Sequence, residues 1–472
     1  MQIYFSVQDF GKIKEAKVNI SNYTVFVGNN NSGKTYLMQL IYGILVRLTQ
    51  FNTIDTYTKK IVDELKKNTV LRINNEIVEM IQNCINNYLE KNKEKIIYEI
   101  FQKEIQINKL YIELTLDEDD NFEFQYLESD RIKEITNVFT SFKTKKNDTI
   151  NVEKLMTNLF SLNKPFSVMV AGSFNNKNKS TVDSITVSMR DENEDVFSSS
   201  IIQHILNLNE KENYLFIPAS RTGLLLLYRE FFAKKTDELI TVFSNNEQNQ
   251  NKNKYGLTMP VYDFLRFLQT AKVNEKKVQQ NSKLISFIEE NIIEGHLSLN
   301  SDNKIEYTPQ NCTNIIPLYL TSSMINELTP LILQLSDDRN PQYLIIDEIE
   351  TSLHPSKQVE MARLLSRLNN SGTKLIVSTH SDTMATKINN LLLLSLSKLS
   401  KEKKSEILKK TRMTQSDLLK NQNIHIYQFE NINSGKSIVK EVYFNQHTGY
   451  QFDMFNDSVL NLYNESKTIL EI

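Results

Sequence analysis

The sequence predicts an α/β fold in which helices cover a largely parallel β-sheet, and three observations support this prediction. An apolar run at 23–27 leads into the glycine-containing segment 28–35, which a helical pattern follows at 36–46. A second apolar run, at 343–346, ends in two acidic residues. A third, at 374–378, ends in a polar segment. Short continuous apolar runs are typical of strands that are buried on both faces.

The segment Gly28–Thr35 reads GNNNSGKT and fits the pattern G-x-x-x-x-G-K-[ST] of a phosphate-binding loop. Its two glycines allow backbone turns that point N–H groups at phosphate oxygens, and the following helix presents its positive end to them. The residues expected to bind the nucleotide are Asn30, Asn31, Ser32, Gly33, Lys34 and Thr35. Lys34 would reach the outer phosphates, and the Thr35 hydroxyl would ligate Mg²⁺. The alternative is a glycine-rich turn before an ordinary helix. Such a turn does not need both a buried strand before it and a helix directly after it, and the sequence predicts both.

The composition is that of a globular chain without a strong charge bias. The chain has 472 residues, 40% of them hydrophobic, and a formal net charge of −2. This length allows a nucleotide domain with a large insertion, and the charge supplies no general basic field for nucleic acid. Cys84 and Cys312 lack metal-ligand spacing, so we expect both to be reduced and packed in a cytoplasmic protein. No apolar stretch approaches the roughly 18 residues of a membrane span.

Residues 51–210 are predicted to form a mainly helical insertion with β hairpins. Apolar residues follow a helical 3,4,3 spacing at Val78, Ile81, Ile85 and Tyr88. This pattern covers about two heptads, which favours a compact helix over a long coiled coil. Alternating residues at 111–116 and 122–127 predict a hairpin around the acids at 117–120, and further strands are expected at 166–170 and 184–189. We interpret the four acids as solvated turn residues, with a metal site as the alternative.

Residues 211–309 are predicted to combine a strand at 214–217, which leads into Arg221, with a polar loop and a helical segment. The stretch 244–254 is almost wholly Asn, Gln, Lys and Glu, so we expect a mobile loop. Helical patterns follow at 259–271 and 284–293. The lysine-rich segment 398–412 is interpreted as a solvated helix or loop, with a phosphate- or partner-binding patch as the alternative.

Asp347 and Glu348 follow a buried strand, and the carboxyl ends of such strands are where ligands bind in open α/β sheets. Asp347 is expected to ligate Mg²⁺, and Glu348 is expected to orient or deprotonate the attacking water. A purely structural role for two adjacent buried acids would be costly. The apolar run at 374–378 leads similarly into Thr379-His380-Ser381.

These motifs resemble those of ABC-type ATPases, and specifically the OLD-like branch of AAA-annotated ATPases related to SMC and RecF proteins. The matching segments are Asp9–Ile13, Gly28–Thr35, Asp347-Glu348, Glu350–Pro355 and Thr379–Ser381. The resemblance implies a P-loop NTPase fold of ABC-ATPase type with an antiparallel β subdomain and a mostly helical insertion. Residues 1–50 and 310–472 would be the two sequence parts of the ATPase core, 51–210 the insertion, and 211–309 a family strand-arginine element with its loop and helical segment.

The resemblance also implies roles for residues outside the phosphate loop. His380 would be the switch histidine that senses the γ-phosphate. Two ATPase heads would sandwich two nucleotides, and Ser322 and Ser323 of each head would touch the γ-phosphate bound by the other. Met324 stands where the family commonly has glycine, and the two serines could instead be helix caps. Arg221 is a candidate contact to phosphate or to a partner.

In function, the resemblance implies a Mg²⁺-dependent ATP-binding and ATP-hydrolysing switch that forms a homodimer or a higher homo-oligomer and controls a separate effector protein. A nuclease within this chain is not expected, because Asp453 and Asp457 are spaced too far apart for the D-x-D strand end of the nuclease domain that some relatives carry. Free-standing OLD-like ATPases are similar to components of bacterial anti-phage systems such as PARIS and Septu, where a nuclease is one candidate effector. Two alternatives remain: a DNA-binding repair ATPase of RecF or SMC type, and an ATP-gated scaffold with little hydrolysis. No membrane partner is expected.

Overall fold

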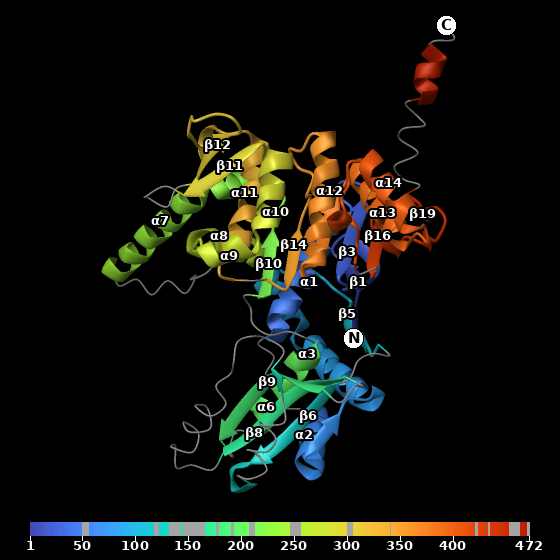
Figure 1. The fold of residues 1–472 in the computed structure, drawn as a ribbon. Coiled ribbons are helices and arrows are strands. Elements are labelled where there is room, and N and C mark those ends of the chain that lie inside the picture. The colour runs from blue at the N-terminus through green and yellow to red at the C-terminus, as the bar shows by residue number, and fades with distance from the viewer. Residues whose placement is uncertain are drawn as a thin grey trace. The chain divides into compact units, whose positions relative to one another are not determined.

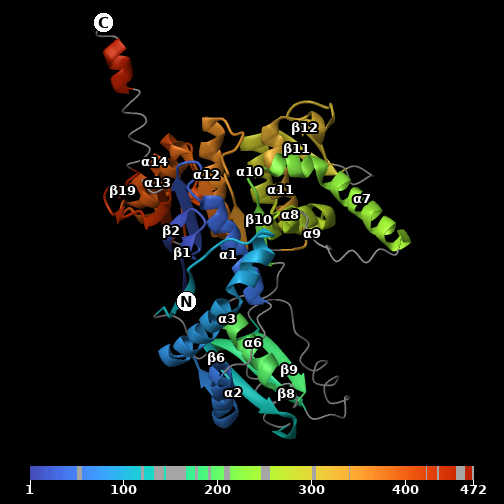
Figure 2. The same cartoon turned by 180° about the vertical axis from the view of Figure 1, so that it is seen from behind.

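The computed structural model describes residues 1–49, 56–117, 122–131, 143–144, 166–175, 179–189, 193–206, 213–245, 256–299, 305–339, 341–420, 423–432, 435–452 and 463–469. The chain divides into two compact units. The smaller unit consists of residues 1–6, 44–96 and 109–211, and the larger unit of residues 7–43, 97–108 and 212–472. Figures 1 and 2 show the elements from opposite sides.

The larger unit is organised around a sheet whose strands come from distant parts of the sequence. Their order is β10-β14-β15-β3-β16-β17-β2-β1. Their bounds are β10 (Tyr214–Ile217), β14 (Tyr343–Ile346), β15 (Lys374–Thr379), β3 (Tyr23–Gly28), β16 (Ile424–Asn431), β17 (Ser437–Glu441), β2 (Ile13–Asn19) and β1 (Gln2–Phe10, whose first residues, up to residue 6, belong to the smaller unit). The strands from β10 to β16 run parallel to their neighbours, and β17 is antiparallel to β16. The predicted α/β fold with a largely parallel sheet is confirmed.

The three apolar runs that predicted this sheet are its central strands. The four side chains of β14 are at most 1% exposed, and those of Val27 in β3 and Val377 in β15 are fully buried. In the strand register, Ile346 lies opposite Val377, and Thr379 lies opposite Val27. Because β14, β15 and β3 end at the same edge of the sheet, the polar segments that follow them are brought together there.

Several helices of the larger unit begin after residues whose side chains cap them. His354 caps α12 by accepting a hydrogen bond from the Ser356 backbone, and Ser381 caps α13 by accepting one from the Met384 backbone. The helices are α1 (Lys34–Thr49, which extends into the smaller unit), α7 (Arg221–Asn245), α8 (Met259–Thr270), α9 (Glu275–Gln280), α10 (Ser282–Ile288), α11 (Ser323–Ser336), α12 (Pro355–Asn370), α13 (Asp382–Leu396) and α14 (Lys401–Lys410). The short helical turns are η4 (Glu289–Ile293), η5 (Leu318–Leu320) and η6 (Gln415–Asp417). Small sheets add β11 (Gly295–Leu299), β12 (Ile305–Pro309) and β13 (Ile316–Pro317), and β18 (Phe444–Asn445) with β19 (Gly449–Tyr450).

The smaller unit combines helices with a second sheet of order β4-β6-β8-β9-β7. Its elements are α2 (Thr56–Asn68), most of α3 (Asn75–Phe101), α6 (Asn193–Ile205), β4 (Val70–Arg72), β5 (Lys109–Thr115), β6 (Phe122–Glu128), η1 (Ser129–Arg131), β7 (Lys143–Thr144), β8 (Phe166–Asn175) and β9 (Lys179–Met189). The predicted hairpin of β5 with β6 is wrong. β5 is hydrogen-bonded to β1, whereas β6 pairs with β4 and β8. Among the described strands of this unit, β8 instead pairs antiparallel with the next strand in the sequence, β9.

Several of the predicted features fall on residues that the structure does not describe, and the prediction for the two cysteines needs a correction. Most of the polar stretch 244–254, the acids at 118–120, and both Asp453 and Asp457 lie outside the described residues. Cys84 is buried as expected, but Cys312 is exposed, so the prediction that both cysteines are packed is wrong for Cys312. Within the described ranges, the helices include none with the length and apolar character that crossing a membrane requires.

Candidate functional site

The phosphate loop connects β3 to α1, and its backbone conformation explains both glycines. Gly28 has φ +148°, and a Cβ atom there would lie 2.7 Å from the Phe429 carbonyl oxygen on β16. Gly33 has φ +99°, and Asn31 adopts the left-handed conformation with φ +58°. A side chain at Gly28 would therefore collide with the neighbouring strand, and one at Gly33 would be strained.

Lys34 is folded back over the loop. Its Nζ donates hydrogen bonds to the carbonyl oxygens of Asn29 (2.8 Å) and Gly28 (3.0 Å), and only 4% of the residue is exposed. Burial lowers the pKa of Lys34 to about 8, although the carboxylates of Asp347 and Glu348 act in the opposite direction. The loop thus contains an ammonium group that is held close to where phosphate oxygens would bind.

Asp347 joins the phosphate loop to the two central strands beside it. Its Oδ2 accepts a hydrogen bond from the Thr35 hydroxyl (2.7 Å), and its Oδ1 accepts one from the Ser378 hydroxyl (2.6 Å). Burial raises the pKa of Asp347 despite these two hydrogen bonds. Mg²⁺ prefers six oxygen ligands in an octahedral arrangement. In nucleotide sites the protein usually supplies a hydroxyl and a carboxylate, and phosphates and water supply the others. The residues present therefore fit a magnesium ion that nucleotide phosphates complete.

Glu348 and His380 form a second pair at the same edge of the sheet. His380 Nε2 lies 3.6 Å from Glu348 Oε1, and this contact is the main cause that lowers the pKa of Glu348. Glu348 adopts a left-handed conformation with φ +47°, and its backbone N–H donates to the Ser378 hydroxyl (2.8 Å). Its side chain is 39% exposed, so the carboxylate is accessible to water.

A profile of the AAA ATPase domain family matches residues 1–385. The chain belongs to the AAA ATPase domain family. None of the curated proteins matches the chain.

Solved structures similar to the chain include three SMC heads. An SMC head bound to the C-winged helix domain of ScpA is 12% identical, with a TM-score of 0.34 over 94% of this chain and 98% of that chain. An SMC head with an extended coiled coil, bound to the C-terminal domain of ScpA from Pyrococcus furiosus, is 11% identical, with a TM-score of 0.34 over 98% of both chains. The SMC head domain from Thermotoga maritima is 11% identical, with a TM-score of 0.33 over 94% of this chain and 100% of that chain. Because these TM-scores are below 0.5, we conclude nothing about the function of this AAA family member from the similarity to SMC heads.

Arg221 of this AAA family member is buried, which corrects the expectation that it faces a phosphate or a partner. It is 1% exposed, and its Nη1 and Nη2 donate to the carbonyl oxygens of Asp347 (2.9 Å) and Glu348 (3.2 Å). Its Nε lies 2.6 Å from Glu327 Oε2 on α11, although the Nε hydrogen points to the Glu327 carbonyl oxygen (3.1 Å). Arg221 therefore joins the turn after β14 to α11.

The predicted signature serines lie at the start of α11. Ser322 is its N-cap residue but makes no side-chain capping hydrogen bond, so the helix-cap alternative gains no support. Both Ser322 and Ser323 are exposed. Among the described residues, the hydrogen bonds of the phosphate loop include none from these two serines. The structure thus brings Lys34, Thr35, Asp347, Glu348 and His380 together, but not Ser322 and Ser323.

Two residues of the site were not singled out from the sequence. Ser378 donates to Asp347 and accepts from Glu348, and Ser437 donates from its hydroxyl to the Ser32 carbonyl (2.6 Å). Ser378 lies in β15 at the end of its apolar run, two residues before His380, and this position was a usable signal. Ser437 carried no signal, because more than 400 residues separate it from the loop that it supports.

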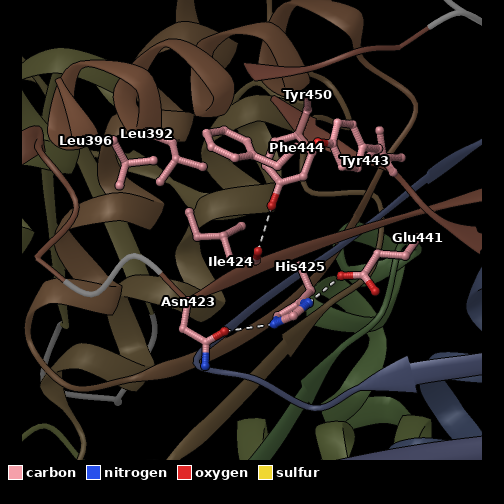
Figure 3. Close-up of a pocket in the computed structure, with 10 residues that line it drawn as sticks. Leu392, Leu396, Asn423, Ile424, His425, Glu441, Tyr443, Phe444 and Tyr450 are labelled. Carbon is pink, nitrogen blue, oxygen red and sulfur yellow. Dashed lines mark hydrogen bonds and ion pairs between the residues drawn. The ribbon is translucent and has the colours of Figure 1, made fainter. Parts of the chain in front are cut away.

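A cavity of about 520 Å³ lies elsewhere in the larger unit. Figure 3 shows its apolar side chains, among them Leu392, Phe444 and Tyr450, and a polar end where His425 lies between Asn423 and Glu441. The cavity is lined by Ile424, which pairs with Tyr23 at the beginning of β3, whereas the phosphate loop follows the end of β3. It is therefore not the candidate nucleotide site.

The depressed pKa of Lys34 predicts how ATP affinity depends on pH. Bound phosphates stabilise the ammonium form and raise this pKa, so binding takes up a proton when Lys34 is neutral. Affinity should be highest below about pH 8, where burial places the pKa of Lys34, and should fall by up to about tenfold per pH unit above it. Calorimetry between about pH 7 and 9, in buffers of different ionisation enthalpy, measures this uptake. An affinity and a proton count that do not change with pH would contradict the assignment.

Proposed function

We propose that this AAA family member is a Mg²⁺-dependent ATPase switch that dimerises around ATP and controls a separate effector protein in bacterial anti-phage defence. The observation that carries the proposal is the meeting of Lys34, the Thr35–Asp347 pair and the Glu348–His380 pair at one edge of the sheet. ATP hydrolysis needs a cation for the phosphates, oxygen ligands for Mg²⁺ and a group that orients the attacking water.

Each group has a distinct task in this proposal. Backbone N–H groups of the loop, from Asn30 to Thr35, would bind the phosphates, and Lys34 would exchange its two carbonyl contacts for phosphate oxygens. Thr35 and Asp347 would hold Mg²⁺, which supplies positive charge to the β- and γ-phosphates. Glu348 would accept the proton of the attacking water, and His380 would donate a hydrogen bond to the γ-phosphate.

The dimer would place Ser322 and Ser323 of one copy against ATP held by the other. Three large apolar side chains precede these serines, and they are strongly exposed: Ile315 (61%), Tyr319 (70%) and Leu320 (66%). Exposed large apolar side chains are candidates for an interaction site. These three, close together in the sequence, support an interface next to the serines, and the resemblance to free-standing OLD-like ATPases supports a separate effector.

The DNA-binding alternative depends on α14, the helix of the predicted lysine-rich segment. Its five lysines are interspersed with two acids, Glu402 and Glu406, and Lys410 is paired with Glu406 at 2.7 Å. The acids partly neutralise the positive charge that contacts with DNA phosphates need, so we do not favour DNA binding. Salt-sensitive DNA binding that disappears when the α14 lysines are replaced would reverse this preference.

The central test is nucleotide binding to the Lys34→Ala variant. The wild type should bind ATP in the presence of Mg²⁺, and Lys34→Ala should weaken binding about 100-fold, because it removes charged hydrogen bonds to the phosphates. Calorimetry measures both affinities. The matched control is Lys276→Ala, a change at an exposed lysine on α9, which should leave affinity unchanged. Equal affinities of wild type and Lys34→Ala would contradict a nucleotide site at this loop.

A further inference from the structure

Tyr36 is an exposed aromatic side chain beside the phosphate loop, and its ring is held in place. It follows Thr35 in the first turn of α1 and is 52% exposed. Its ring stacks on Phe101, with the ring centroids 5.8 Å apart and an angle of 22° between the planes. The ring also lies edge-on to Phe10, at 6.4 Å and 72°. Phe10 is fully buried and Phe101 is 7% exposed, so one face of the Tyr36 ring packs against buried aromatic side chains while about half of the residue stays exposed.

The strand order determines which part of a nucleotide this ring would meet. Thr35 points towards Asp347 at the end of β14, and β14 and β1 lie on opposite sides of β3 in the sheet. Successive residues of a helix project about 100° apart. Tyr36 accordingly points away from Asp347 and towards Phe10, at the end of β1.

The turn after β1 also contacts the loop directly. Lys12 Nζ donates a hydrogen bond to the Asn31 carbonyl (2.5 Å), and Gly11 has φ +54°. The side of the loop opposite Asp347 is therefore formed by this turn and by Tyr36. A triphosphate whose outer end lies at Lys34 and Asp347 directs its nucleoside end towards this side.

We infer that the open face of Tyr36 is the platform on which the base of the bound nucleotide stacks. This inference rests on the proposed function, since it requires ATP at the phosphate loop. The chemistry is general: every nucleobase has a π-face, and an aromatic ring that is already ordered loses little conformational entropy on stacking. Tyr36 thereby adds affinity for the nucleoside part of ATP and none for its phosphates.

The test compares ATP with inorganic tripolyphosphate, which has the phosphates but no base. Tyr36→Ala should lower the affinity for Mg²⁺-ATP about tenfold and leave that for Mg²⁺-tripolyphosphate unchanged, because stacking of one base on an aromatic side chain contributes about 1–3 kcal/mol. Tyr36→Phe should retain the affinity for both ligands. The matched control is Tyr98→Ala, at a tyrosine on α3 that is 39% exposed. It should change neither affinity.

The outcomes separate this inference from the proposed function. Equal losses of ATP and tripolyphosphate affinity in Tyr36→Ala would mean that the loop itself is disturbed and would overturn the platform. Unchanged ATP affinity would also overturn it, while a Lys34→Ala effect on both ligands would leave the nucleotide site standing. If the wild type binds neither ligand, the proposed function fails and the platform fails with it.

Discussion

Glu348→Gln should bind ATP with nearly wild-type affinity and hydrolyse it at least about 100 times more slowly. The amide keeps the shape of the side chain but cannot accept a proton from water, and general-base catalysis typically contributes 10²–10⁴-fold. The side chain is 39% exposed, so the substitution leaves no buried group without a partner. The ATP-bound state should therefore persist, and a nucleotide-dependent dimer should accumulate.

The surroundings of Glu348 support its assignment as the base. His380 Nε2 is 3.6 Å away, and this contact keeps the pKa of Glu348 below its usual range. A group whose pKa is lowered stays ionised as the pH falls towards that value. Protonation of Glu348 should therefore not reduce turnover at any pH above the usual pKa range of a glutamate side chain. A pH–rate profile measures this.

Three measurements together test the variant: phosphate release, ATP affinity, and molar mass by light scattering with and without ATP. Glu402→Gln is the matched control, because Glu402 is exposed on α14 and lies apart from the site in sequence and fold. Equal turnover in wild type and Glu348→Gln would reject Glu348 as the base. Negligible turnover in the wild type, with ATP-dependent dimerisation intact, would favour the ATP-gated scaffold.

The parts of the site that could be predicted are those whose residues are contiguous in sequence. The phosphate loop, Asp347-Glu348 and His380 each follow an apolar run, and parallel strands place such ends at one edge. The hairpin predicted for β5 and β6 was wrong because alternation predicts strands but not their partners. The burial of Arg221 could not be predicted either, since its partners on α11 and after β14 lie more than 100 residues away.

The second large effect is expected for Arg221→Met, which should lower the free energy of unfolding by about 3–5 kcal/mol. Arg221 is 1% exposed and Glu327 is 5% exposed, and burial raises the pKa of Glu327 although Arg221 opposes this. Removing the guanidinium leaves a buried carboxylate without its counter-charge, which is the costly way to break a buried ion pair. Urea unfolding followed by tyrosine fluorescence measures the change, because the chain has 20 tyrosines and no tryptophan.

An exposed Lys–Glu pair provides the control for this effect. Lys410 lies 2.7 Å from Glu406, and their side chains are 73% and 62% exposed, so Lys410→Met should change stability by less than about 1 kcal/mol. Adding Glu327→Gln to Arg221→Met should restore most of the lost stability, because the amide needs no counter-charge and still accepts the Thr222 hydroxyl hydrogen bond. If the double variant is no more stable than Arg221→Met, the unpaired charge is not the cause.

The same double variant tests whether Arg221 also positions Glu348, independently of its effect on stability. Arg221 donates to the carbonyl oxygens of Asp347 and Glu348, and the left-handed backbone of Glu348 is a conformation that costs about 1–2 kcal/mol without such support. Neither of the two substituted side chains replaces these hydrogen bonds. The double variant should therefore fold and bind ATP, yet hydrolyse it about tenfold more slowly than wild type. Recovery of turnover together with stability would mean that Arg221 serves only the fold and does not position Glu348.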